Sequence, residues 1–231
     1  MSSTPKKPKN KPGQARTLTR QKIVANAIAL SDQAGYETLS MRKLAAKLGV
    51  TAMSLYNHVA NKDALLDLML DRIVAEFETP SPQGNWQEMM RRRAHSMRNA
   101  FLRHSWAPPL MISKIALGDE ILRDLNATVG CLVSAGFSYA QADWAKNAID
   151  SHIYGYTLQE LNYPVAPDEY KSAAARFLPK ISKADYPFVH GAAKEIIDGN
   201  YDGITRFDFG LDLILDGLQK QLDAAATDPR P

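Results

Sequence analysis

The sequence predicts an all-α fold with two helical domains of unequal size. Apolar residues recur three and four positions apart along most of the 231 residues, and no segment shows the alternation typical of a strand. The charge is also uneven. Residues 1–62 contain eleven Lys or Arg and two acidic residues, a net charge of +9, whereas the remainder carries −6. A basic N-terminal module that binds a polyanion, joined to a larger module with another task, fits this distribution.

The first helix is expected from about Leu18 to Ala34, and Gly35 ends it. Its inner side is an apolar stripe made of Ile23, Ala27, Leu30 and Ala34. A second, short helix follows, capped by Ser40 and closed by Gly49, because glycine adopts the left-handed conformation without steric cost. The apolar stripe of this second helix consists of Met41, Leu44, Ala45 and Leu48.

Thr51 caps a third, short helix in which only Leu55 and Val59 share an inward face. A helix with so little apolar surface has to be held by its neighbours, which leaves its outer face free. Two short helices joined by a tight turn, the second with a free outer face, are typical of the helix-turn-helix that lays one helix along DNA. We therefore interpret residues 18–80 as a helix-turn-helix DNA-binding domain.

A fourth helix, capped by Asn61, is expected to run to about Glu78, where the segment 80–84, Pro-Ser-Pro-Gln-Gly, breaks it. We expect this helix to pack against both domains. The larger helical domain then covers residues 81–222. Residues 1–17 are rich in Lys and Pro and are expected to form a disordered basic arm, and residues 223–231 a disordered tail.

Five further helices are predicted in the second domain. They cover residues 86–104, 119–135, 138–161, 187–198 and 204–222. The segment Trp106-Ala-Pro-Pro is expected to stop the first of them, and residues 162–187 to form a loose connection with a short helix inside it. The last helix is apolar over most of its circumference, with Leu211 and Ile214 on one side and Phe209 and Leu213 on the other. It must therefore be buried on more than one side.

The segment Gly-Val-Thr-Ala-Met-Ser-Leu-Tyr-Asn-His-Val-Ala-Asn-Lys-Asp-Ala-Leu-Leu, residues 49–66, resembles the recognition-helix signature of the tetracycline-repressor (TetR) family. Trp86-Gln, Phe101-Leu-Arg, Ser134-Ala-Gly-Phe-Ser and Phe207-Asp-Phe-Gly-Leu-Asp-Leu-Ile-Leu-Asp-Gly resemble the C-terminal domain of the tetracycline-repressor subgroup. The resemblance implies a C-terminal effector and dimerisation domain. Helices 138–161 and 204–222 of two subunits would form a four-helix bundle, which agrees with the apolar excess of the last helix.

Ten residues are expected to contact double-stranded operator DNA. They are Ser40, Arg42, Thr51, Ala52, Met53, Ser54, Tyr56, Asn57, His58 and Lys62. An arginine such as Arg42 can grip guanine O6 and N7 together, and the resemblance implies a base-reading arginine there. The hydroxyl, imidazole and ammonium donors suit phosphates. Met53 suits a thymine methyl group, and Asn57 an adenine or a phosphate, whereas Tyr56 is alternatively a packing residue between helices.

Nine residues are candidates for a small-molecule effector site. They are Met90, Arg93, Met97, Trp106, Met111, Phe137, Trp144, Asn147 and Asp150. Methionine and aromatic side chains suit an adaptable apolar pocket, although such stripes also build ordinary cores. Asn147 and Asp150 share one helix face with Tyr154, where they line either a cavity or the dimer seam.

One departure from the tetracycline repressors affects the expected ligand. The resemblance places their ligand-binding asparagine and phenylalanine on Arg93 and Met97, and their metal-binding histidine near Met111. Magnesium-tetracycline is therefore not the expected effector, and Arg93 marks either an anionic effector or a plain surface position. No metal or cofactor is expected, because the five histidines are scattered and Cys131 stands alone.

These observations predict a homodimeric, ligand-responsive transcriptional regulator, a repressor that binds a palindromic operator and is released by a small molecule. A regulator of the same fold without an effector is the main alternative. An enzyme built on the helical body is a second, for which no catalytic motif is visible. No apolar run is long enough to span a bilayer and no secretory signal is recognisable, so we expect a cytoplasmic protein without a membrane partner.

Overall fold

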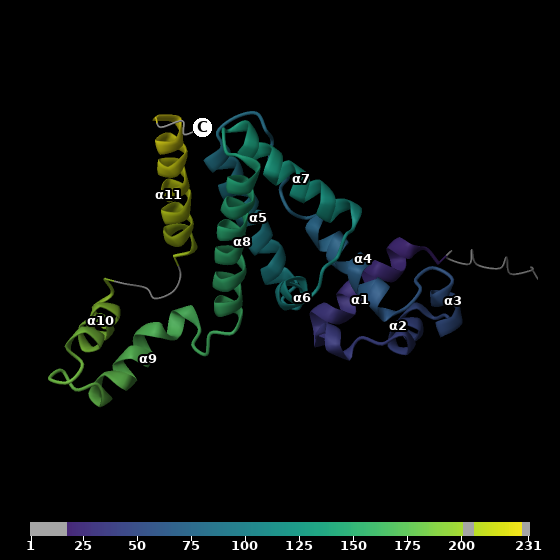
Figure 1. The fold of residues 1–231 in the computed structure, drawn as a ribbon. Coiled ribbons are helices and arrows are strands. Elements are labelled where there is room, and N and C mark those ends of the chain that lie inside the picture. The colour runs from purple at the N-terminus through teal and green to yellow at the C-terminus, as the bar shows by residue number, and fades with distance from the viewer. Residues whose placement is uncertain (1–17, 201–205, 228–231) are drawn as a thin grey trace, which may run out of the picture.

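The computed structural model describes residues 18–200 and 206–227, and every regular element in this part of the chain is helical (Figure 1). The prediction of an all-α fold is confirmed. In the described residues, four α-helices at the N-terminal end are followed by seven in the larger domain. The expected basic arm, residues 1–17, lies outside the described residues. Within the described ranges no helix is long and apolar enough to cross a membrane.

The N-terminal helices begin where the capping residues predict. They are α1 (Arg20–Ala34), α2 (Met41–Leu48), α3 (Ala52–Tyr56) and α4 (Lys62–Val74). The side-chain oxygens of Ser40, Thr51 and Asn61 each accept a hydrogen bond from the backbone N–H three residues further on, which satisfies donors that the helix itself leaves free. Gly49 ends α2 in the left-handed conformation, with φ of 69°.

Two details of this domain differ from the prediction. Ala34 is exposed at the end of α1, so it does not belong to the inner stripe, although Ile23 and Ala27 are buried as expected. Helix α4 ends at Val74 and not near Glu78. The chain continues in tight turns that still bury Phe77, whose ring meets the edge of Phe101 at 5.6 Å between centroids.

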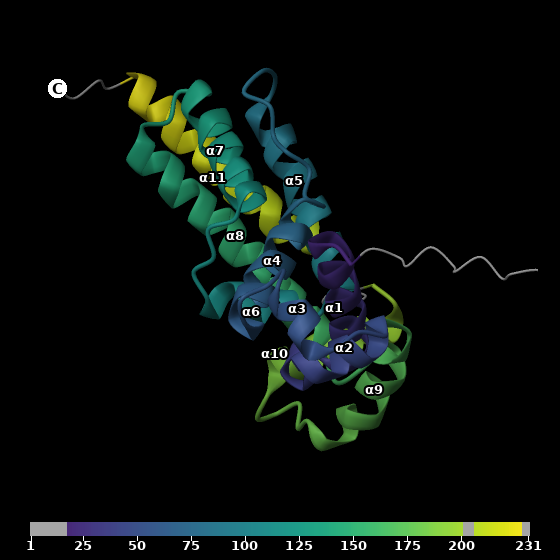
Figure 2. The same ribbon diagram turned by 90° about the vertical axis from the view of Figure 1, so that its right-hand side faces the viewer.

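The larger domain is built around one long helix. Its helices are α5 (Trp86–Arg103), α6 (Ala107–Ser113), α7 (Asp119–Ser134), α8 (Tyr139–Leu161), α9 (Tyr170–Phe177), α10 (Pro187–Asp198) and α11 (Phe207–Thr227). Helix α8 contacts α5, α6, α7 and α11, and Figure 2 shows α7, α8 and α11 running alongside one another. Helices α9 and α10 pack on each other and lie apart from the other C-terminal helices in Figure 1.

Two predictions for the larger domain are corrected. The segment beginning at Trp106 does stop α5, but it also begins α6, because Pro108 and Pro109 occupy a first helical turn in which the backbone N–H is not needed. Residues 223–227 are not a disordered tail. Helix α11 continues through them, as the run of alanines after Asp223 favours. The predicted beginning of this helix at Ile204 lies outside the described residues.

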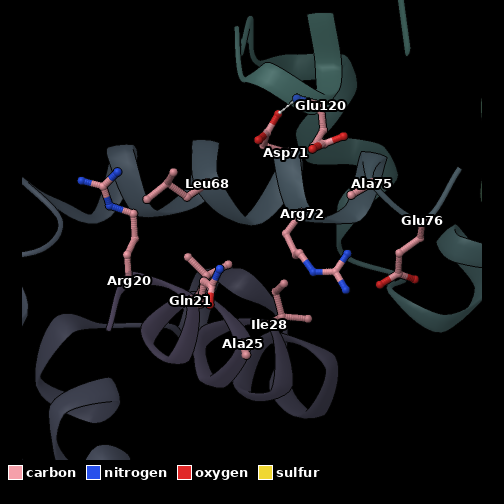
Figure 3. A pocket seen from close by; sticks show the side chains of 11 residues that line it. Arg20, Gln21, Ala25, Ile28, Leu68, Asp71, Arg72, Ala75, Glu76 and Glu120 are labelled. Atoms are coloured by element: carbon pink, nitrogen blue, oxygen red, sulfur yellow. Dashed lines mark hydrogen bonds between the residues drawn. The ribbon is translucent and has the colours of Figure 1, made fainter. Parts of the chain in front are cut away.

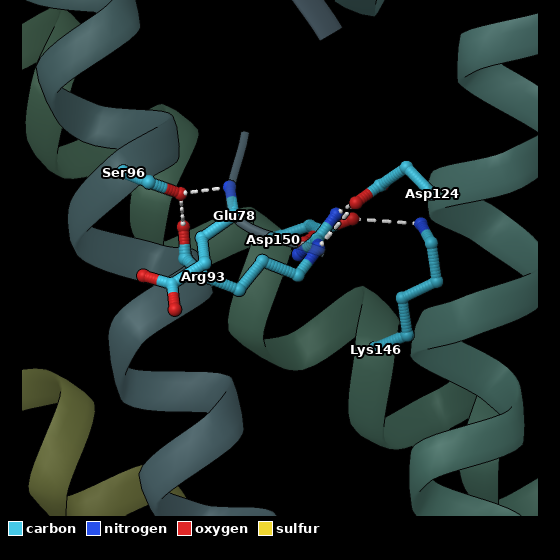
Figure 4. A network of polar contacts seen from close by, with 6 residues as sticks. All are labelled: Glu78, Arg93, Ser96, Asp124, Lys146 and Asp150. Atoms are coloured by element: carbon cyan, nitrogen blue, oxygen red, sulfur yellow. Dashed lines mark hydrogen bonds and ion pairs between the residues drawn. The ribbon is translucent and has the colours of Figure 1, made fainter. Parts of the chain in front are cut away.

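A buried arginine holds three helices of the larger domain together (Figure 4). Arg93 of α5 is 2% exposed. Its Nε and Nη2 donate to the two carboxylate oxygens of Asp124 on α7, at 3.0 and 2.8 Å, and its Nη1 donates to Asp150 on α8 at 2.7 Å. Lys146 Nζ donates to the other oxygen of Asp150 at 2.7 Å. The positive charges of Arg93 and Lys146 therefore compensate the negative charges of Asp124 and Asp150.

Electrostatics favour the charged forms of Arg93 and Asp150. Burial disfavours a charged carboxylate, but the charges of Arg93 and Lys146 outweigh it and lower the pKa of Asp150. Burial likewise opposes the charge of Arg93, and the two aspartates outweigh it and raise the pKa of the guanidinium. A buried ion pair adds little net stability over an apolar core, but the loss of one partner leaves an uncompensated charge.

Helix α4 belongs to both domains, and a carboxylate fixes its position on the second. It packs on α1 on one side and on α7 on the other. Asp71 of α4 accepts hydrogen bonds from the backbone N–H groups of Glu120 and Ile121, at 2.9 and 3.1 Å, at the beginning of α7. Gly118 makes room for this contact, since a Cβ atom there would lie 2.0 Å from Asp71 Oδ1.

Further polar contacts join the domains. Lys114, just after α6, pairs with Asp63 of α4 at 2.7 Å. Asp32 of α1 accepts hydrogen bonds from the indole Nε1 of Trp106 at 2.7 Å and pairs with His104 Nδ1 at 2.8 Å. The N-terminal domain is therefore held to the larger one from both α1 and α4.

We expect Asp124→Ala to lower the free energy of unfolding by about 3 kcal/mol. This is near the smallest loss seen when one partner of a buried ion pair is removed, because Asp150 still neutralises part of the Arg93 charge. Urea denaturation followed by circular dichroism measures the change. Glu78→Ala is the matched control. It removes a carboxylate from the exposed pair with Arg92 and should cost no more than about 1 kcal/mol. Equal losses in the two variants would contradict the role of the buried network.

Candidate DNA-binding surface and effector site

The outer face of α3 is open, as the helical spacing predicts. Leu55 is the buried residue of α3, and Val59 is buried just after it. Met53 points outwards and is 72% exposed, and Tyr56 is also exposed. An exposed methionine on a short, polar helix has no packing role, so this face is available to a partner.

Helices α2 and α3 form the recognition hairpin, and its capping residues keep their hydroxyl groups at the surface. Ser40 Oγ accepts from the N–H of Lys43 at 3.2 Å, and Thr51 Oγ1 lies 2.9 Å from Ser54 Oγ. A capping hydroxyl still has a hydrogen to donate, so Ser40 can cap α2 and bind a phosphate at once. Arg42 is exposed beside these residues at the beginning of α2.

The remaining predicted DNA residues lie at the beginning of α3 and around the turn between α3 and α4. Asn57 is exposed, and Ala52 and His58 are half-buried. Lys62 Nζ donates to the backbone oxygen of Glu37 at 3.4 Å, which holds its ammonium group near the 3-10 turn Tyr36–Thr38. The structure therefore brings the ten residues onto one hairpin and its immediate flanks, and their contacts with DNA stay predictions.

The sequence did not single out two basic residues of this surface. Arg20 Nε donates to the backbone oxygen of His58 at 3.3 Å, which ties the beginning of α1 to the end of the recognition hairpin. Lys43 Nζ donates to the backbone oxygen of Thr38 at 2.9 Å. The charge run alone gave no signal for either contact, because both depend on how the helices fold back on each other.

The nine candidate effector residues do not form one group. Met90, Arg93 and Met97 lie on the buried side of α5, with Asp150 opposite on α8. Arg93 is no surface residue, and its charge is already neutralised by two carboxylates. This removes the reason to expect an anionic effector at Arg93. Tyr154 follows Asp150 by one turn, and its ring stacks on Phe101 with 5.3 Å between centroids.

The other candidates lie further from this cluster. Phe137 packs edge-on against Trp86 at 5.2 Å, and Trp106 is buried at the junction with α1. Met111 is half-buried on α6. Trp144 is 68% exposed, and exposed Asn147 donates to Asp143 at 3.3 Å. Trp144 and Asn147 therefore lie on the outer side of α8, away from the interior of this chain.

The outer sides of α8 and α11 form a second exposed apolar surface. Tyr139 and Trp144 of α8 are exposed, as are Phe209 and Leu213 of α11, which are 65% and 61% exposed. Helices α8 and α11 pack on each other within the chain. Leu211 is completely buried in its own chain, so it belongs to the core and not to this surface. In the described part of the chain, no group of three His, Cys, Asp or Glu is arranged to hold a metal ion.

Comparisons with known proteins find a matching family for each of the two domains. Residues 23–69 match the bacterial regulatory proteins of the tetR family, and residues 79–222 match the tetracyclin repressor-like C-terminal domain. The chain is 33% identical over 210 residues to an HTH-type transcriptional regulator of Saccharopolyspora erythraea, which covers 89% of this chain and 87% of that protein.

Two further relatives are also transcriptional regulators of this family. Identity with the tetracycline repressor protein class D of Escherichia coli is 30% over 214 residues, covering 90% of this chain and 92% of that one. The crystal structure of ActR from Streptomyces coelicolor in complex with actinorhodin matches with a TM-score of 0.75 at 29% identity, and covers 89% of this chain and 99% of ActR. The helix-turn-helix at α2 and α3 and the helical body behind it are thus those of a DNA-binding regulator and not of an enzyme, and the chain belongs to the TetR family of transcriptional regulators.

Proposed function

We propose that the chain is a homodimeric repressor that binds a palindromic operator in the cytoplasm through α2 and α3. A small molecule that enters the larger domain would release it. The open outer face of α3, with Met53 exposed on it and with Arg42 of α2 and Asn57 exposed nearby, is the observation that carries this function. Hydrogen-bonding side chains and one exposed apolar group on a short helix suit base edges in the major groove.

The exposed faces of α8 and α11 support the dimer. A monomer rarely exposes large apolar side chains on two neighbouring helices, and pairing this surface with its copy about a two-fold axis would bury them. Trp144 and Leu213 would then lie in a four-helix bundle. A two-fold dimer presents two copies of α3, which suits an operator with two symmetric half-sites.

Crystal structures of similar proteins in complex with small molecules support an effector of this kind. ActR was crystallised with actinorhodin, and TetR from Acinetobacter baumannii, in its Q116A form and at 26% identity, with minocycline. In this chain, Met90 and Met97 supply adaptable apolar surface. Because the charges of Arg93 and Asp150 are already compensated within the network, we expect a mostly apolar effector that makes one or two polar contacts.

We expect Arg42→Ala to weaken operator binding by about 1–3 kcal/mol and to relax the preference at one base pair, because a bidentate contact to guanine would be lost. Lys62→Ala should weaken binding to all sequences alike, as loss of a phosphate contact does. Gel-shift titrations with an operator selected by the protein itself, and with single-base variants of it, separate the two effects. Arg176→Ala, the loss of an arginine on α9, is the control. Unchanged preference in Arg42→Ala would refute its base-reading role.

We expect Leu213→Asp and Trp144→Asp to convert the dimer into folded monomers. Both side chains are exposed in the single chain, so the fold is kept, whereas an unpaired carboxylate buried in the seam costs several kcal/mol. Light scattering and circular dichroism report mass and helix content. Ile115→Asp, the same change at an exposed residue outside α8 and α11, should stay dimeric. A dimer in all three variants would show that the seam lies elsewhere.

We expect actinorhodin or minocycline to bind without magnesium, because no histidine stands where the tetracycline repressors hold their metal. Binding should lower operator affinity by roughly 5- to 150-fold, and operator should weaken ligand binding by the same factor. Calorimetric titrations of the free and operator-bound protein, with and without magnesium, measure both. Met97→Trp should block the site, and Leu122→Trp, on the exposed side of α7, should not. Binding that requires magnesium would contradict this pocket.

A further inference from the structure

A cleft lies between α1 and α4, away from all nine candidate effector residues (Figure 3). Its volume is about 720 Å³, within the ~300–1,000 Å³ typical of small-molecule sites. Helix α1 forms one wall, α4 the other, and Glu120 at the beginning of α7 reaches its edge. The cleft is therefore bounded by the DNA-binding domain on one side and touches the larger domain on the other.

The floor of this cleft is apolar. Val24 and Ile28 of α1 and Leu68 of α4 line it, together with the small side chains Ala25 and Ala75, which leave the space open. An apolar floor of this kind favours a ligand with an apolar body, because covering it removes apolar surface from water.

Most charged groups around the cleft already have partners. Asp71 accepts from the backbone of α7, and Arg20 donates to the oxygen of His58. Glu76 pairs with Arg103 at 2.7 Å, and Glu120 pairs with Arg123. These interactions pair Glu76 and Glu120 with arginines, and they hold Asp71 and Arg20 through hydrogen bonds to the backbone.

Arg72 is the exception. It is exposed on α4, and Figure 3 shows its guanidinium extending over the cleft on the side of Ile28. Among the described residues it has no hydrogen-bond or ion-pair partner within 4.0 Å. Gln21 lies opposite on α1 and lines the same cleft. A planar guanidinium with free donors is suited to a carboxylate or sulfonate, which it can bind through two parallel hydrogen bonds.

We infer that this cleft is a second small-molecule site, for an amphiphilic monoanion with an apolar ring system. The ring system lies on Val24, Ile28 and Leu68, and its anionic group binds Arg72. A single negative charge is specified because, of the two guanidinium groups that line the cleft, Arg72 alone has no hydrogen-bond partner among the described residues. The site is distinct from the effector site in the larger domain and acts directly on the α1–α4 pair.

The cleft is placed to influence DNA binding. Helix α1 packs on α2 and is tied through Arg20 to the end of the recognition hairpin. Helix α4 is tied through Asp71 to α7. A ligand between α1 and α4 contacts the two helices that together carry the hairpin and join it to the larger domain.

The probe for this site is 1-anilinonaphthalene-8-sulfonate, which combines an aromatic body with one sulfonate and fluoresces when it is bound. We expect a saturable site on the full chain that Arg72→Gln weakens about tenfold, the effect of losing one charge-assisted contact of about 1.4 kcal/mol. Ala25→Trp should abolish this site by filling the cleft. Lys47→Gln is the control, because it removes one positive charge from the same domain outside the cleft, and it should bind the probe as the unchanged protein does.

Competition experiments test whether the site prefers an anionic ligand to a cationic one. Naphthalene-2-carboxylate should displace the probe, whereas 2-naphthylmethylammonium, of similar shape and opposite charge, should not. Circular dichroism confirms that each variant is folded, and Phe188→Ser checks for probe bound at the exposed apolar helix α10. Unchanged affinity and stoichiometry in both Arg72→Gln and Ala25→Trp, or equal displacement by the cation, would overturn the assignment.

Discussion

A guanidinium buried in the larger domain can keep its charge only if anions surround it, and this requirement organises the domain. Arg93 comes from α5, and its partners Asp124 and Asp150 come from α7 and α8. Their oxygens have to lie within hydrogen-bonding distance of one planar group, which fixes the rotation and height of three helices together. Apolar packing around Met97 and Ile149 tolerates small shifts of a helix, whereas these directed hydrogen bonds do not.

The helices that this network positions are also those that meet the DNA-binding domain. Helix α7 carries Asp124 near its middle and receives the carboxylate of Asp71 at its beginning. A displacement of α7 along its axis would therefore shift α4. Because α4 packs on α1, the shift would change the position of α3. Met90 and Met97 lie on the same buried side of α5 as Arg93, so the effector that we propose for the larger domain would act beside this arrangement.

Short-range signals in the sequence predicted the N-terminal domain well. Ser40, Thr51 and Asn61 cap their helices as expected, because an N-cap depends only on residues three positions away. The inward position of Leu55 and the outward position of Met53 followed from helical spacing. The start of α6 was missed, since proline is equally suited to ending one helix and beginning the next.

The effector site was harder to predict, for a physical reason. Helix α8 is moderately apolar all round, so its periodicity does not tell which side faces its own domain. Trp144 was a candidate for the pocket and Asn147 for the pocket or the dimer seam, and both lie on the outer side of the helix. The pairing of Lys146 with Asp150 is local and visible at spacing four. Asp124 and Asp71 gave no signal, because their partners are brought to them only by tertiary structure.

The contact between Asp71 and α7 also restricts how the sequence can change with time. A Cβ atom at residue 118 and the carboxylate of Asp71 would occupy the same space. The two positions are thus linked although 47 residues separate them along the chain. A side chain at 118 forces Asp71 to move or to be replaced, whereas the acid can be lost while glycine remains. Replacing the acid before the glycine is therefore the less costly order of the two substitutions.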